Sequence, residues 1–398
     1  MHDRSRRMRA SPGAILGWVL CVIVSCGGPY RDGGDGKDQW TEERSATDRR
    51  IVSMLDAERF AEAITLIDRT AAEYGEYPRL LGQKARALGG LGRTDEAVPL
   101  FERALLADYT SCENHVNFAV LLMKMGKAGR AITEFNEAKQ FCGAENIVMI
   151  HRNLAVAELE LGRKERALSS VQSGLEYDPD DVYLLGLHAV LIMDTQPIEA
   201  ESLFTRARRV GDLEPAFLHQ YGLLLLNSGR PEEAVAVLDT AAALMPDDYE
   251  VQRNRAEALI RTGRPDQAEA VLRGLCERYG GPGITEGLAR ALFKQDRFAE
   301  ALDLYRELPE SPEVQDRIAM CLHGLGRLDE AVEVQRGVLA ERPGWPTALV
   351  DMAVILAARG ELDGALEYLI RALEIDPDNA TARSNLEQLR EAMEKSGK

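Results

Sequence analysis

Aromatic side chains are scarce in this chain of 398 residues, at 6% of its composition. It also lacks a glycine-rich phosphate loop, paired cysteine motifs with the spacing of a zinc site, and a Gly-x-Ser-x-Gly nucleophile elbow. Each of these motifs carries the chemistry of a large enzyme class. The sequence therefore predicts no enzyme activity, no cofactor, no metal ion and no small-molecule substrate.

The chain also has fewer basic than acidic residues. Lys and Arg number 48 against 65 Asp and Glu, which gives a formal net charge of −17. A surface this acidic repels phosphate backbones, so we expect no nucleic-acid partner. The only strongly apolar run in the amino-terminal region, residues 14–24, is too short to span a bilayer as a helix.

What the chain has in quantity is a repeated helical pattern. Residues 215–248 read as two amphipathic helices around a turn that ends at Gly229, because glycine takes the left-handed conformation that closes a helix. Pro231 suits the first turn of the second helix, and Pro246 ends it. Equivalent alanines, used below as register marks, recur every 30 to 36 residues: Ala63, Ala97, Ala131, Ala167, Ala200, Ala234, Ala268, Ala301, Ala331 and Ala365. Such a period predicts stacked helical hairpins.

Other positions keep this register. Five residues before the marks stand turn glycines: Gly92, Gly126, Gly162, Gly229, Gly263, Gly326 and Gly360. In these positions the chain resembles the tetratricopeptide-repeat (TPR) proteins over residues 48–379, in ten units. The resemblance implies an all-α fold, a right-handed superhelix (α-solenoid) of about ten helical hairpins, with residues 380–398 as a carboxy-terminal capping helix. Pro309 and Pro312 should end the second helix of the eighth unit early.

In TPR proteins the first helices line a concave groove, at positions that include those fifteen, eleven and eight residues before each mark. The resemblance therefore implies a partner-binding groove in the third to sixth units, with Asn117 and Asn153 bonding the backbone of an extended peptide. Its other residues would be Val116, Val120, Met123, Arg152, Val156, Leu159, Leu185, Ala189, Ile192, His219, Leu223 and Leu226.

This strip is mostly apolar and becomes charged in the seventh and eighth units, at residues such as Arg253, Glu257 and Arg290. Its composition favours an apolar segment of a partner protein, an amphipathic helix or a hydrophobic strand, as the ligand. The alternative is that these residues only pack against neighbouring helices.

Residues 1–25 have the form of a secretory signal peptide, with a basic head before the apolar run. The residues Ile23-Val24-Ser25-Cys26 resemble the lipobox of bacterial lipoproteins, which implies that Cys26 is acylated and becomes the mature amino terminus. An ordinary cleaved signal or an uncleaved anchor remains the alternative. Residues 26–47 are rich in Gly and Asp, which predicts a flexible tether. The expected location is the bacterial cell envelope, anchored by lipid in the outer membrane and facing the periplasm.

Four further cysteines lie in the repeats. Cys112 opens the first helix of the third unit and Cys142 closes its second helix, and antiparallel helices bring these ends together. Export to an oxidising compartment would allow a disulfide between them, against the alternative of two neighbouring free thiols. Cys276 and Cys321 lie on apolar helix faces and are expected to be buried thiols.

Two functions are consistent with these sequence features. One is a lipid-anchored protein–protein interaction scaffold that binds a protein or peptide partner in the concave groove. The other is a structural assembly subunit of a pilus, secretion or outer-membrane biogenesis machine, which docks through its convex surface. An accessory to cell-wall synthesis would have the same sequence features.

Overall fold

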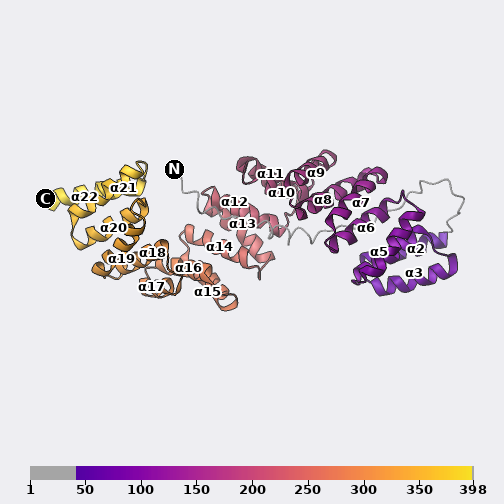
Figure 1. Cartoon of the computed structure of the whole chain (residues 1–398), viewed down its shortest axis with the longest axis horizontal. Coiled ribbons are helices and arrows are strands. Elements are labelled where there is room, and N and C mark those ends of the chain that lie inside the picture. Colours follow the sequence, from indigo (N-terminus) through magenta and orange to yellow (C-terminus); the bar gives the residue numbers. More distant parts are fainter. Residues whose placement is uncertain (1–41, 397–398) are drawn as a thin grey trace. The chain divides into compact units, whose positions relative to one another are not determined.

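The computed structural model describes residues 42–396, and every regular element in this range is an α-helix. The helices follow one another as ten hairpins, from α2–α3 to α20–α21, with α22 after them (Figure 1). The predicted all-α fold of tandem helical hairpins is therefore confirmed. The signal peptide, Cys26 and residues 27–41 of the expected tether lie outside the described residues.

The described chain divides into two compact units, with the boundary inside α12 between Phe217 and Leu218. Helices of the amino-terminal unit are α2 (Glu42–Asp56), α3 (Phe60–Tyr74), α4 (Pro78–Gly90), α5 (Thr94–Ala107), α6 (Cys112–Lys124), α7 (Ala128–Phe141), α8 (Ala144–Glu160), α9 (Lys164–Tyr177), α10 (Val182–Ile192) and α11 (Pro197–Val210). The helices that follow are α12 (Pro215–Asn227), α13 (Pro231–Leu244), α14 (Tyr249–Arg261), α15 (Pro265–Arg278), α16 (Pro282–Phe293), α17 (Phe298–Glu307), α18 (Pro312–Gly324), α19 (Leu328–Glu341), α20 (Pro346–Arg359), α21 (Leu362–Ile375) and α22 (Ala380–Ser396).

Small residues set the distance between the two helices of a hairpin. All ten register alanines are fully buried, with 0% of their surface exposed. On α12 the small residue is Gly222, where a Cβ atom would lie 2.5 Å from the side chain of Leu238 on α13. Four residues after the mark, large side chains such as Phe101 and Phe204 fill the space beside the close contact. The core is therefore a series of short contacts between alternating small and large side chains.

In nine of the ten hairpins the turn contains a left-handed residue five positions before the mark, and the exception is the fifth hairpin, which has Thr195 there. Gly92 and Gly229 have φ angles of 75° and 74° there, as the sequence pattern predicted. The first and eighth hairpins place Glu58 and Asp296 at the same position, and these residues adopt φ angles of 55° and 58°. The turn geometry thus persists without glycine, at the cost of a conformation that side chains disfavour.

Helix ends differ from expectation at one place and agree at another. The tether was expected to reach residue 47, but α2 already begins at Glu42. Arg44 in the first turn lies over the ring of Tyr77, 4.1 Å from its centroid, and further along α2 Asp48 accepts a hydrogen bond of 2.7 Å from Gln83 and pairs with Arg79 at 2.9 Å. The early end of α17 at Glu307 is confirmed. Within residues 42–396 no helix combines the length and the apolar character that crossing a membrane requires.

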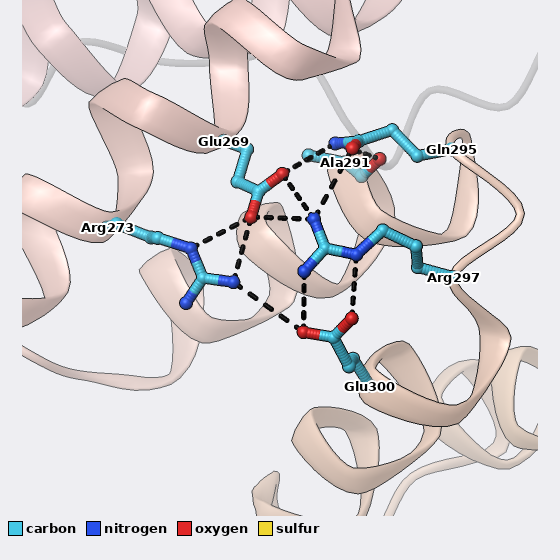
Figure 2. A network of polar contacts seen from close by, with 6 residues as sticks. All are labelled: Glu269, Arg273, Ala291, Gln295, Arg297 and Glu300. Atoms are coloured by element: carbon cyan, nitrogen blue, oxygen red, sulfur yellow. Dashed lines mark hydrogen bonds and ion pairs between the residues drawn. The ribbon is translucent and has the colours of Figure 1, made fainter.

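Polar contacts also join neighbouring hairpins. Figure 2 shows Glu269 of α15 between Arg273 of the same helix and Arg297 at the start of α17. Glu269 accepts hydrogen bonds of 2.7 Å from Arg297 and 2.9 Å from Gln295. Burial alone would raise the pKa of Glu269, but these hydrogen bonds outweigh it and hold the pKa below its ordinary value. Arg297 also binds Glu300, so the network connects the seventh hairpin to the eighth.

Candidate functional site

In each hairpin, the positions fifteen, fourteen, eleven and eight residues before the alanine mark lie on one face of the first helix. Two cavities in the described part of the chain open on this face. We call it the first-helix face. One cavity, the amino-terminal pocket, lies among α2, α4 and α6. The other, the carboxy-terminal pocket, lies among α14, α15 and α16. Each pocket lies wholly within one of the two compact units.

The amino-terminal pocket has a volume of about 250 Å³. Its lining residues are Leu55, Asp56, Glu58, Phe60, Ala85, Arg86, Gly89, Gly90, Phe101, Asn117, Val120, Leu121 and Lys124. Asn117 is only 5% exposed, and its Oδ1 atom has no hydrogen-bond partner in the described part of the chain. Arg86 donates from Nη2 to Asp56 at 2.7 Å, whereas its buried Nη1 has no partner there. Two lining residues therefore carry an unpaired acceptor and an unpaired donor, both of which are buried behind the surface of the pocket.

The carboxy-terminal pocket is larger, about 390 Å³, and more charged. Glu257 pairs with Arg261 on its own helix and with Arg290 on α16, both at 2.7 Å. Burial alone would raise the pKa of Glu257, but the two guanidinium groups hold it below its ordinary value. Arg253 and Glu286 complete the charged lining, which leaves an excess of one positive charge.

An amide stands at the base of this second pocket as well. Asn254 is 1% exposed, and its Nδ2 lies 2.7 Å from Nε2 of His219, a contact in which the imidazole nitrogen can accept. The Oδ1 atom of Asn254 is buried without a partner among the described residues, and so is Nε of Arg253. Each pocket is thus lined by a buried amide and an arginine that have an unpaired atom, but the arginines differ in position: Arg86 lies on the first helix of the hairpin before that of Asn117, whereas Arg253 directly precedes Asn254 on α14.

This arrangement has a signal in the sequence that the groove prediction used only in part. Fourteen residues before the mark, side-chain amides recur and are buried: Gln83, Asn117, Asn153, Gln220 and Asn254. A buried polar atom without a partner costs roughly 1–3 kcal/mol. Among the described residues, Gln83, Asn117 and Asn254 leave a side-chain oxygen without a partner, and Asn153 leaves its amide nitrogen without one.

The predicted groove residues of the third to sixth units are mostly inaccessible. Those that the structure buries are Val116, Asn117, Val120, Met123, Asn153, Val156, Leu185, Ala189, Ile192, Leu223 and Leu226. Arg152, Leu159 and His219 remain partly exposed, and Arg152 forms an ion pair with Asp181. Burial favours the alternative in which this strip packs between helices. The structure brings Asn117 and Val120 together in the amino-terminal pocket. The groove prediction missed Arg86 because this residue lies in the second hairpin, outside the third to sixth hairpins that the prediction covered.

Outside the pockets, the third hairpin contains a second polar cluster. A disulfide joins Cys112 to Cys142 with a Cα–Cα distance of 5.0 Å. Beside it, His115 is 1% exposed, and its ring nitrogens lie 2.8 Å from a carboxylate oxygen of Glu134 and 2.8 Å from the carbonyl of Tyr109. Both neighbours are acceptors, so the imidazolium form satisfies both contacts. Burial by itself would lower the pKa of His115, but the two hydrogen bonds outweigh it and raise the pKa.

The remaining thiols differ from each other. Cys321 is buried as expected, and burial raises its pKa to about 12. Cys276 is only half-buried, because α15 leaves part of that residue uncovered, so the expectation of two buried thiols was wrong for it. Within the described residues no group of three or more His, Cys, Asp or Glu side chains is arranged to hold a metal ion.

Four family models, each described as a tetratricopeptide repeat, match the chain over residues 225–281 and 322–389, 199–249, 282–307 and 78–110. Together these segments cover just over half of the sequence. With the hairpin fold and its register of small residues, they show that the chain belongs to the tetratricopeptide-repeat proteins.

Curated relatives include two human proteins. Protein O-mannosyl-transferase TMTC1 is 28% identical over 199 residues, which is 48% of this chain and 22% of that protein. Protein O-mannosyl-transferase TMTC2 is 39% identical over 71 residues, 18% of this chain and 8% of that protein. The chain therefore spans less than a quarter of the length of either relative.

Solved structures of similar fold include a tetratricopeptide repeat protein from Parabacteroides merdae, with 17% identity and a TM-score of 0.43 over 62% of this chain and 98% of that one. Yeast Tom70 has 15% identity and a TM-score of 0.40 over 89% of this chain and 90% of that one. Scores this low carry no argument about function.

Proposed function

We propose that this protein is an interaction scaffold that binds an extended segment of a partner protein on its first-helix face, and that an acylated Cys26 anchors it in the bacterial cell envelope. The observation that supports binding is the unpaired, buried acceptor and donor found in each pocket. Tetratricopeptide-repeat hairpins commonly serve protein–protein interaction, and the pockets supply the chemistry for it here.

An extended polypeptide backbone matches these groups. Asn117 Oδ1 would accept from a backbone N–H of the partner, and Arg86 Nη1 would donate to a backbone carbonyl. In the other pocket Asn254 Oδ1 and Arg253 Nε would take the same two roles. Because an extended chain presents N–H and C=O groups along its whole length, it satisfies such pairs whatever its side chains are.

The lining changes what we expect of the ligand. The sequence predicted an apolar segment, because the strip in the third to sixth units is apolar. That strip is buried, and the open pockets carry Asp56, Arg86 and Lys124 in one unit and three arginines in the other. A polar segment fits these linings better, with an acidic residue favoured beside Arg253, Arg261 and Arg290.

The test of binding uses quantitative capture from detergent-solubilised envelopes. Replacing Asn117 and Asn254 together by Leu keeps the branched side-chain shape and removes both unpaired oxygens, but it also removes the contact of Asn254 with His219, so folding of the variant is checked by thermal melting. The exposed Asn136 of α7 offers a matched control, Asn136→Leu. We expect a partner protein that is retained by the wild type and by the control. The amount of this partner captured by the double variant should be at least tenfold lower.

Equal capture by a folded double variant would refute binding at the pockets. Leu106 on α5, a second helix, is 88% exposed. If Leu106→Asp loses capture instead, the protein docks through its second helices. The identified partner should then be tested as synthetic segments, so that affinity is measured directly.

Anchoring rests on the sequence around Cys26. A diacylglycerol thioether and an N-acyl chain together exceed the single chain that gives only marginal membrane binding. Growth with an alkyne-labelled fatty acid should label the wild type and leave Cys26→Ser unlabelled. Incorporation into both proteins at the same level would exclude lipidation of this cysteine.

A further inference from the structure

The ninth hairpin breaks the repeat pattern at a buried position. Four residues after the alanine mark, other hairpins bury an apolar or aromatic side chain, such as Phe135 or Leu238, whereas α19 carries Gln335. Gln335 is 0% exposed. An amide in an apolar space is costly unless its hydrogen bonds are made inside the protein. The partners of Gln335 therefore show what this position requires.

Gln335 connects three helices. Its Nε2 donates to Asp316 Oδ1 on α18 at 2.8 Å and to the carbonyl of Ala348 on α20 at 2.9 Å. Asp316 is itself 0% exposed, and its second oxygen, Oδ2, has no donor among the described residues. Asp351 is partly exposed and lies on α20 one turn after Ala348, whose carbonyl accepts from Gln335, and its carboxyl group interacts with that of Asp316. An enclosed carboxylate with one unpaired oxygen thus faces a second carboxyl group.

Two carboxyl groups in this position cannot both ionise without strong repulsion, and a proton on one supplies the donor that the other lacks. Among the described residues, the charges that act on the pair are Arg317 and Glu313 of α18, while α19 presents the neutral amide of Gln335. Arg317 favours the ionised forms and Glu313 opposes them. We propose that Asp316 and Asp351 share one proton, which locks α18 to α20, and that its loss loosens the ninth and tenth hairpins.

The direction of the pH effect follows from linkage. Burial, with the nearby charge of Asp316, raises the pKa of Asp351 to about 7. An aspartate in an unfolded chain has a pKa of about 3.9. Between these values the folded protein holds a proton that the unfolded chain has released, so stability falls as pH rises through this interval and levels off above it. This inference does not depend on the proposed function.

The experiment is amide hydrogen exchange of α18–α20 in the full chain, read by mass spectrometry from pH 5 to pH 8 and corrected for the intrinsic pH dependence of exchange. We expect opening of this region to increase by up to roughly tenfold per pH unit below pH 7 and then to level off. Asp351→Asn should abolish this dependence, because the amide donates to Asp316 at every pH. The exposed Asp303 provides a matched control, Asp303→Asn, which should behave as the wild type.

A second measurement does not rely on opening. Infrared difference spectra at pH 6 should show the C=O band of a protonated carboxylic acid that Asp351→Asn loses and Asp303→Asn keeps. If Asp351→Asn does not fold, Asp316→Asn makes the same test, since its amide can donate to Asp351. Unchanged pH dependence and an unchanged band in a folded variant would overturn the proposal. So would protection of the wild type by Mg²⁺ or Ca²⁺ at pH 8 that Asp351→Asn lacks, which would indicate a cation between the carboxylates.

Discussion

Removing the disulfide of the third hairpin should destabilise that hairpin specifically. The bridge between Cys112 and Cys142 joins residues 30 positions apart in sequence. For a loop of this length the chain-entropy relation gives a stabilisation of about 3.6 kcal/mol. Hairpins in a repeat array contact only their neighbours, so most of this loss should appear as local opening of α6 and α7. Converted to an equilibrium constant, the opening should increase by at most a few hundredfold, roughly tenfold per 1.4 kcal/mol.

The assay is hydrogen exchange of α6 and α7 with and without a phosphine reductant. We expect faster exchange on reduction in the wild type, the same fast exchange in the Cys112→Ser, Cys142→Ser double variant, and no response of that variant to reductant. The half-buried Cys276 supplies a control, Cys276→Ser, which should respond as the wild type does. The reasoning is refuted if reduction leaves exchange of the third hairpin unchanged. Alkylation of both cysteines without prior reduction would show that the bridge does not form.

Two further predictions concern charged groups whose bonds the structure defines. The hydrogen bond to Glu134 helps raise the pKa of His115 in the folded protein, so the stability from this contact is fully present below the unfolded pKa of about 6.5 and is lost as pH rises through the folded pKa. The melting temperature of His115→Gln should therefore lie below that of the wild type at pH 6 and approach it at pH 9. A difference in melting temperature that stays constant between these pH values would contradict this. For Glu269 the folded pKa is lowered, so Glu269→Gln should reduce the free energy of unfolding, measured with urea at pH 7, by roughly 1 kcal/mol. The difference between variant and wild type should vanish as pH falls through the folded pKa. If the difference persists in acid, packing and not charge explains it.

The helical hairpins were predictable because their determinants are local. A turn glycine such as Gly92, a helix-starting proline such as Pro231 and an alanine mark act within one repeat, and their period specifies how often the unit recurs. The early end of α17 was predictable for the same reason, since proline interrupts a helix wherever the neighbours lie. Even the two cysteines of the third hairpin could be placed at adjoining ends from their positions in one repeat.

Exposure could not be predicted, because it depends on how closely successive hairpins pack. The register identified the face that carries Val116 and Leu185, but only the packing of neighbouring first helices decides that these side chains are buried while Arg86 borders an open pocket. Contacts between hairpins are equally non-local. Nothing in one repeat indicates that Asp316 would meet a carboxyl group of the next, or that contacts with α4 would extend α2 back to Glu42. The sequence by itself determined the repeating unit, and only the tertiary structure decided which of its polar groups are left without a partner.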